Sequence, residues 1–146
     1  MIKSCVVIGS GNVATHLAKA LAPHIEVRQI FSRNITHAKE LARAISPSCT
    51  AIDNAGAIDC DADLYLMSVT DDSISTLVRE IRGCDRGIWV HTSGSVGLDA
   101  FDGMREHCGV FYPLQTFSKN KDVDMRQVPL FIEGGDAETE HELTAL

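Results

Sequence analysis

The stretch Cys5-Val6-Val7-Ile8-Gly9-Ser10-Gly11-Asn12-Val13-Ala14 lies near the start of the chain and predicts its fold. A short apolar run leads into Gly-x-Gly-x-x-Ala, and a helix-like segment follows. Gly9 allows a tight turn out of a strand, Gly11 leaves room for a pyrophosphate, and Ala14 allows close packing of helix on strand. The helix N-terminus directs free N–H groups at the phosphates. The residues expected to form this nucleotide pocket are Gly9, Ser10, Gly11, Asn12 and Val13.

Apolar periodicity predicts that strands and helices alternate along the rest of the chain. We expect strands at residues 4–8, 25–31, 50–52, 64–69, 88–90, 110–112 and 130–133. We expect helices that start near Asn12, at a Thr36 cap and at a Thr70 or Asp71 cap, and a short helix that includes Phe101. This alternation predicts an α/β fold with a doubly wound, mostly parallel sheet and right-handed crossovers. The ligand would then lie at the carboxyl ends of the strands.

The composition restricts the kinds of partner that the chain is suited to bind. Its 146 residues, 45% hydrophobic and 23% charged, are enough for one globular domain with a real core. The formal net charge of -7 argues against nucleic acid or an anionic membrane surface as the main partner. No apolar stretch reaches the length of a membrane span, and the N-terminus lacks the pattern of a signal peptide. The expected partner is a small-molecule substrate.

Five cysteines are scattered along the chain without a Cys-x-x-Cys pair. Because their number is odd and Cys5 lies in a predicted buried strand, we interpret them as reduced thiols of a cytoplasmic protein. A zinc site would need His107, Cys108 and a distant partner, but adjacent residues seldom point the same way.

An acidic cluster, Asp59, Asp61 and Asp63, resembles a metal loop only superficially. It lacks the glycine and the downstream glutamate of a calcium loop, so a solvated turn explains it better. We therefore predict no metal site.

The segment Ser32-Arg33-Asn34 follows the second predicted strand, where a chain that binds NAD carries Asp or Glu. A carboxylate there would repel a 2′-phosphate, whereas Arg33 can pair with that phosphate and stack on adenine. Ser32 and Asn34 can donate hydrogen bonds. The segment predicts NADP(H) in preference to NAD(H); the alternative is that Arg33 is a solvated loop residue.

Two further turns leave predicted strands on the ligand side of the sheet. Ser68-Val69-Thr70-Asp71-Asp72 supplies Ser68, Val69 and Thr70 as candidate contacts of the nicotinamide ribose, although Thr70 and Asp71 can equally cap a helix. His91-Thr92-Ser93-Gly94-Ser95 carries a histidine whose ordinary pKa suits proton transfer near neutrality. We assign the catalytic role to His91, with Ser93 and Ser95 as orienting groups. The alternative is a hydrogen-bonded histidine at a strand end.

A third strand-end loop, Tyr112-Pro113-Leu114-Gln115-Thr116-Phe117, has two interpretations. Tyr112 and Gln115 could reach a ligand, or the aromatic side chains pack while Pro113 fixes the turn. The other histidines share no spacing, and most are expected at the surface: His16, His24, His37, His107 and His141.

The C-terminal residues predict the start of a further helix. Gly134-Gly135 is a turn signal, and Asp136 is a good N-cap. We expect residues 1–135 to form the nucleotide-binding domain and residues 136–146 to begin a helix that leads into a longer protein. A short terminal helix is the alternative.

Taken together, these segments resemble a known group of proteins. Residues 7–14 with Phe31-Ser32-Arg33 resemble the pyrroline-5-carboxylate reductase and 6-phosphogluconate dehydrogenase-like Rossmann superfamily. The segments 68–72, 91–95 and 112–119 make the chain similar to a branch of bacterial Rossmann-like oxidoreductases with a separate C-terminal helical domain.

The resemblance implies that NADP lies on Gly9 to Val13, with Ser32 and Arg33 at the adenosine end. It also implies a helical domain after about Leu146 that closes the substrate cleft and makes a homodimer. The function expected is an NADP-dependent oxidoreductase that transfers a hydride to or from a small carbonyl, imine or hydroxy acid. The alternative is a nucleotide-binding sensor or regulatory module without chemistry.

Overall fold

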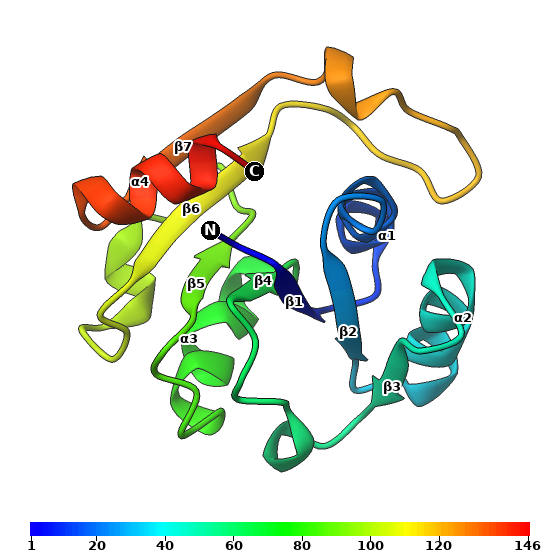
Figure 1. The fold of residues 1–146 in the computed structure, drawn as a ribbon, viewed down its shortest axis with the longest axis horizontal. Coiled ribbons are helices and arrows are strands. Elements are labelled where there is room, and N and C mark those ends of the chain that lie inside the picture. The colour runs from blue at the N-terminus through cyan, green and yellow to red at the C-terminus, as the bar shows by residue number, and fades with distance from the viewer.

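Seven strands form one sheet in the computed structural model, which describes residues 1–146. The order across the sheet is β3-β2-β1-β4-β5-β6-β7, and all neighbours are parallel except β6 and β7 (Figure 1). The predicted α/β fold with a doubly wound, mostly parallel sheet is confirmed. The strands are β1 (Ser4–Ile8), β2 (Glu26–Phe31), β3 (Thr50–Ile52), β4 (Leu64–Met67), β5 (Ile88–His91), β6 (Cys108–Pro113) and β7 (Leu130–Gly134).

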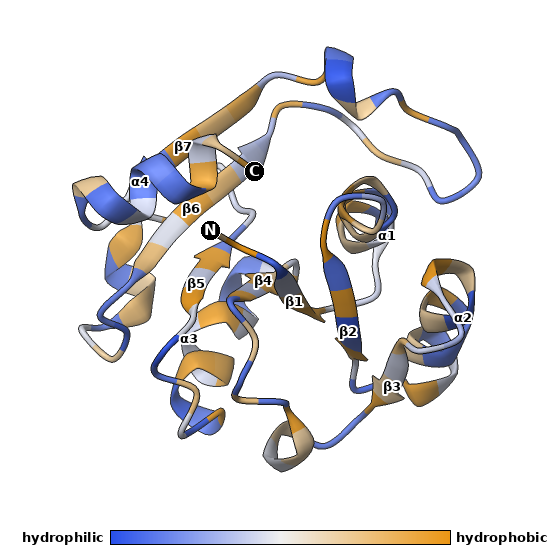
Figure 2. Ribbon diagram, viewed as in Figure 1, coloured by the Kyte–Doolittle hydropathy of each residue, from blue (hydrophilic) through white to orange (hydrophobic).

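Helices cover both faces of the sheet, so the strands between them are apolar on both sides. Side chains of α1, α2 and α4 pack on one face together with Cys5 and Val7, and side chains of α3 and η2 pack on the other with Val6 and Ile8. Hydrophobic and hydrophilic bands alternate along β2, which lies nearer the sheet edge (Figure 2). The helices are α1 (Asn12–Leu21), α2 (Ile35–Ile45), α3 (Asp71–Glu80) and α4 (Ala137–Thr144), with short 3-10 helices η1 (Ala55–Ala57), η2 (Leu98–Phe101) and η3 (Met125–Gln127).

None of these helices combines the length and the apolar character needed to cross a membrane. The last one, α4, begins after the predicted Asp136 cap, whose side chain accepts a hydrogen bond from the Thr139 amide at 2.8 Å. Leu143 of α4 is buried against the same face as α1.

The start of α2 differs from the prediction. The helix begins at Ile35, and Asn34 rather than Thr36 is its cap, because the Asn34 Oδ1 accepts a hydrogen bond from the His37 amide. Asn at the N-cap satisfies a backbone donor that the helix leaves free.

The long connection between β6 and β7 swings past α1 (Figure 1). His16 of α1 holds it there, since its Nε2 lies 2.6 Å from the Ser118 carbonyl oxygen and its ring stacks on Phe117. Both side chains are buried. The expected packing of Phe117 is confirmed, whereas the expected surface position of His16 is wrong, because a distant loop covers it.

Two cysteines expected as free thiols are joined. Cys60, before β4, and Cys84, after α3, form a disulfide, and their Cα atoms are 4.3 Å apart. The other three cysteines are free and buried. Residues 24 apart in sequence meet here because α3 returns the chain to the end of the sheet at which β4 begins. The cytoplasmic location inferred from five reduced thiols therefore loses that support.

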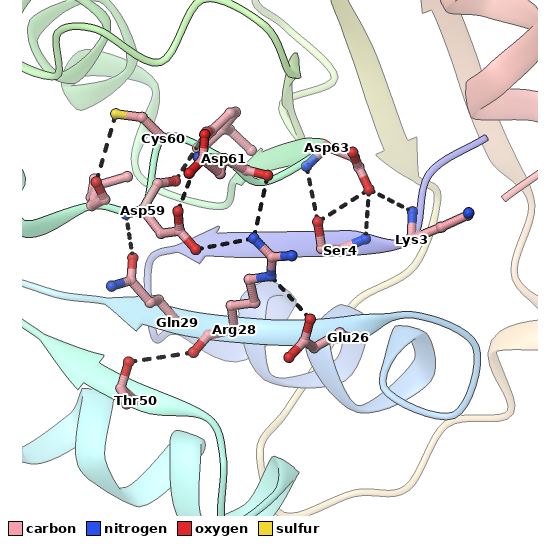
Figure 3. A network of polar contacts seen from close by, with 12 residues as sticks. Lys3, Ser4, Glu26, Arg28, Gln29, Thr50, Asp59, Cys60, Asp61 and Asp63 are labelled. Atoms are coloured by element: carbon pink, nitrogen blue, oxygen red, sulfur yellow. Dashed lines mark hydrogen bonds and ion pairs between the residues drawn. The ribbon is translucent and has the colours of Figure 1, made fainter.

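The acidic cluster before β4 is a turn, as expected, and Asp61 is exposed in it, but Asp59 and Asp63 are partly buried and link this turn to β1 and β2 (Figure 3). The Asp63 carboxylate accepts hydrogen bonds from the Lys3 amide at 2.9 Å and from the amide and hydroxyl of Ser4. Arg28 of β2 donates to Asp59 at 3.1 Å. The Asp63 carboxylate thus satisfies two backbone donors at the start of β1, and the Asp59 carboxylate holds the Arg28 side chain of β2.

We expect Asp63→Ala to lower the free energy of unfolding by about 1–3 kcal/mol near neutral pH, because it leaves donors of Lys3 and Ser4 without a partner. Burial alone would raise the pKa of Asp63, but these hydrogen bonds and Arg28 hold the pKa below the ordinary value of 3.8. The ionised form is therefore the stabilising one.

The deficit of Asp63→Ala should shrink in urea denaturation as the pH falls below 3.8 and the wild-type carboxylate takes up a proton. Asp61→Ala is the control, because the Asp61 side chain is exposed and accepts no hydrogen bond. An equal loss in both variants would contradict the prediction.

Candidate functional site

A cleft of about 560 Å³ opens at the carboxyl ends of β1, β2, β4 and β5. The sheet order reverses between β1 and β4, and doubly wound folds bind ligands at such a switch point. The cleft is lined by Gly9, Ser10, Gly11, Asn12, Val13, Phe31, Ser32, Arg33, Ser68, Val69, Thr70, Asp71, Ser73, Leu77, Thr92 and Ser93.

Gly9 makes the turn from β1 into the cleft, and no other residue fits there. Its φ of +120° lies in a region that side chains avoid, and a Cβ would collide with the Ser68 carbonyl oxygen. The Gly9 amide donates to the Phe31 carbonyl at 2.8 Å, and the Ser68 amide donates to the Ile8 carbonyl at 2.8 Å. The ends of β2, β1 and β4 are thereby joined at one point.

Gly11 has a different reason to lack a side chain. A Cβ on Gly11 would meet no protein atom within 4 Å, so it would project into open space at the edge of the cleft. Stability therefore does not require glycine at this position. The position offers room for a ligand to approach the backbone closely.

The N-terminus of α1 is left free for an anion. No side chain caps it, and its first turn contains no acidic residue. The first amides of a helix have no acceptor within the helix and carry a partial positive charge. Asn12 and Val13, which carry the first of these amides, line the cleft together with Ser10. The arrangement suits a phosphate group.

The end of β2 forms the second part of the cleft. The Ser32 hydroxyl accepts hydrogen bonds from the Ser10 hydroxyl at 2.9 Å and from the Asn34 amide at 3.2 Å. Arg33 is 64% exposed, and its guanidinium lies 3.8 Å from the Glu80 carboxylate, so this cation can reorient toward a ligand. The Asn34 side chain caps α2 and does not line the cleft, unlike Ser32 and Arg33.

The ends of β4 and β5 close the other side. β4 stops at Met67, before the residue predicted, which places Ser68, Val69 and Thr70 in the turn as cleft lining. The Ser68 and Thr92 hydroxyls lie 3.1 Å apart and join the two strand ends. Thr70 occupies the N-cap position of α3, but its hydroxyl lies 2.9 Å from the Ser73 hydroxyl and does not cap a backbone amide.

His91 is buried behind the cleft wall, whereas a proton donor would have to face the cleft. It is 0% exposed, stacks on Phe101 and does not line the cleft. Its Nδ1 accepts a hydrogen bond from the Ser93 amide, so Nε2 carries the hydrogen that it donates to the Gly97 carbonyl at 3.1 Å. Both ring nitrogens are occupied within the protein. The ring holds the turn that carries Ser93 and leaves no free nitrogen for the predicted catalytic role of His91.

The two serines of that turn separate. Ser93 lines the cleft, whereas the Ser95 hydroxyl donates to the Asp71 carboxylate at 3.1 Å and lies outside the lining. Sequence reasoning did not select several cleft residues, although each stands at or just after a strand end or in the first turns of α3: Phe31, Asp71, Ser73, Leu77 and Thr92. No group of side chains suited to a metal ion is present.

The chain resembles several known proteins. The family model described as "NADP oxidoreductase coenzyme F420-dependent" matches residues 4–90, which contain all of the cleft except Thr92 and Ser93. No curated protein matches the chain significantly.

Among solved structures, a Bacteroides fragilis protein provisionally described as an NADP oxidoreductase is 35% identical, with a TM-score of 0.92 over 99% of this chain and 56% of its own. Prephenate dehydrogenase from A. aeolicus, solved with hydroxyphenyl propionate and NAD+, is 10% identical, with a TM-score of 0.76 over 99% and 55%. An imine reductase from Bacillus cereus is 14% identical, with a TM-score of 0.60 over 78% and 42%. The likeness to the prephenate dehydrogenase and to the imine reductase shows the fold alone. The present chain spans about half the length of the Bacteroides fragilis protein and of the prephenate dehydrogenase.

The two glycines of the first turn should respond differently to the same change. We expect Gly9→Ala to lower the free energy of unfolding by more than about 2 kcal/mol, because the alanine is strained and meets the Ser68 carbonyl. Gly11→Ala should stay within about 1 kcal/mol of the wild type. Urea denaturation measures both, and an equally large loss in Gly11→Ala would show that its surroundings are not open.

The buried histidine should make stability depend on pH. Burial lowers the pKa of His91 below its ordinary value of 6.5, so the neutral ring stabilises the fold. Wild type should exceed His91→Asn in the free energy of unfolding by about 1–3 kcal/mol near pH 7.5. This advantage should shrink toward about pH 5.5, since the unfolded chain binds the proton first. His24→Asn, at an exposed position, should show neither effect.

Proposed function

The chain belongs to the family described as NADP oxidoreductase, coenzyme F420-dependent, and from this premise we propose that it binds NADP(H) as the nucleotide-binding domain of an oxidoreductase. The enzyme would transfer a hydride to or from a small carbonyl, imine or hydroxy acid. The observation that carries the proposal is the uncapped N-terminus of α1 beside Gly11, where a missing Cβ leaves open space for a diphosphate.

The choice of NADP(H) over NAD(H) is part of the proposal and rests on the end of β2. The segment that follows β2, Ser32-Arg33-Asn34, contains no carboxylate to bind a ribose 2′-hydroxyl. Arg33 would pair with the 2′-phosphate, and the Ser32 hydroxyl lies beside it in the same wall of the cleft. Asn34 would contribute through its backbone at most, because its side-chain oxygen caps α2.

The turns after β4 and β5 would line the nicotinamide end. When bound, the cofactor supplies the hydride. Ser68, Val69 and Thr70 would contact its ribose, and Ser93 would face the substrate from the next strand end. His91 would act through Ser93, whose amide it binds, as a positioning residue.

We also propose that residues 1–135 are the nucleotide-binding unit and that α4 leads into further chain, which would complete the substrate site and form a homodimer. The relative from Bacteroides fragilis supports this, since the present chain covers 56% of its length. One observation favours the alternative of a sensor without chemistry. The histidine expected to transfer protons is buried, with both nitrogens occupied.

We expect isothermal titration calorimetry to show tighter binding of NADPH than of NADH by the wild-type chain. Arg33→Ala should lower the affinity for NADPH about 10- to 100-fold, which is the equivalent of losing one charge-assisted pair. The same substitution should change the affinity for NADH by less than about 3-fold. Gly11→Ala should weaken both cofactors at unchanged stability, because its methyl group enters the space of the diphosphate.

Arg43→Ala is the control, since Arg43 is an exposed arginine of α2 outside the cleft. Equal affinity of the wild type for both cofactors would contradict the NADP preference. No heat with either would contradict the function. Measuring NADPH oxidation with a panel of small carbonyls and imines distinguishes the two functions. An enzyme would oxidise NADPH with some member of the panel, whereas a sensor would bind NADPH and turn over none.

A further inference from the structure

A second hollow of about 430 Å³ adjoins the cleft and shares Ser93 with it. It lies over β6 and the start of β7, beside the carboxyl end of β5. Most of its wall is apolar, and β7 is largely hydrophobic (Figure 2). The residues that matter here are Ser93, Gly94, Val110, Tyr112, Phe131 and Glu133.

The hollow exists because a helix covers only one face of the β6–β7 pair. α4 covers one face, where Leu143 and Phe111 share a core cluster. On the other face Val110 pairs with Glu133 and Tyr112 with Phe131, and no helix packs over β7. Phe131 is therefore 57% exposed. An exposed aromatic group in a concave wall is typical of a ligand site.

Two hydroxyl groups line the hollow, those of Ser93 and Tyr112. The Tyr112 ring lies so close to Gly94 that a Cβ there would come within 2.5 Å of its Cζ. Gly94 follows Ser93 directly in the chain, so the Tyr112 ring and Ser93 lie in the same part of the hollow. The Tyr112 hydroxyl has no hydrogen-bond partner, and the Ser93 oxygen accepts from the Ser95 amide, which leaves the Ser93 hydrogen free to donate. The hollow therefore offers two free donors, of which Ser93 also lines the cleft.

We propose that this hollow is the subsite for the organic body of the substrate, and that the substrate is an apolar ketone or imine without a carboxylate. The oxygen or nitrogen of the reacting group accepts hydrogen bonds from Ser93 and Tyr112, while its substituent packs on Val110 and Phe131. Glu133, in the same wall, repels a carboxylate, which disfavours hydroxy acids among the substrates considered above. The assignment of this ligand as a substrate rests on the proposed function.

The test uses two probes that differ at one group: benzylacetone, and the keto acid that carries a carboxylate in place of its methyl group. Each is titrated into ¹⁵N-labelled protein, with and without NADPH, and amide shifts are followed by NMR. Benzylacetone should shift the amides of Gly94, Val110 and Ile132, and the keto acid should bind at least about 10-fold more weakly. Glu133→Gln should bring the two probes within about 3-fold of each other.

Two neighbouring residues of β7 provide the variant and its control. Phe131→Ala should lower the affinity for benzylacetone about 10-fold. Leu130→Ala should leave this affinity unchanged, because Leu130 is also exposed but does not line the hollow. NADPH should still shift the amide of Gly11 in both variants.

The outcomes separate this inference from the proposed function. Absence of shifts around the hollow, tighter binding of the keto acid, or unchanged binding by Phe131→Ala would overturn the subsite, even where NADPH still shifts Gly11. If NADPH shifts nothing, the proposed function fails, and the role of the ligand as substrate fails with it.

Discussion

The close approach of two strand ends at Gly9 is the constraint on which the rest of the structure depends. Only a residue without Cβ can pass the Ser68 carbonyl at this point with a positive φ. The turn lets α1 start beside the sheet with its first amides pointing into the cleft. It also joins the ends of β1, β2 and β4 through the Gly9 and Ser68 amides. Three of the four strand ends that form the cleft are therefore held together by that junction.

Much of the fold and of the nucleotide cleft could be predicted, because the relevant signals are local. An apolar strand followed by Gly9 and Gly11 specifies the first turn, and the distance from there to Arg33 is set by one helix and one strand. The helical and strand periods placed the other elements within a few residues. The antiparallel direction of β7 alone leaves the sheet mostly, rather than wholly, parallel.

What the sequence could not reveal depends on contacts between distant residues. His91 looked like a catalytic group, but the direction of its ring is set by Phe101 and the Gly97 carbonyl, which lie after the next turn. His16 is covered by a loop about a hundred residues later in the chain, and Cys60 meets Cys84 only once α3 has packed. Residue type signals chemistry in such cases, but burial decides whether a ligand can use it.

The contact between Arg33 and Glu80 has a consequence for how phosphate binding beside Arg33 would respond to ionic strength. A phosphate that reaches the guanidinium exchanges one anionic neighbour for another, since the carboxylate 3.8 Å away is released to water. Dissolved salt screens the attraction lost as well as the attraction gained. Affinity at this position should therefore fall less steeply with added salt than it would for an isolated arginine, so the ion pair buffers recognition against changes in the surrounding electrolyte.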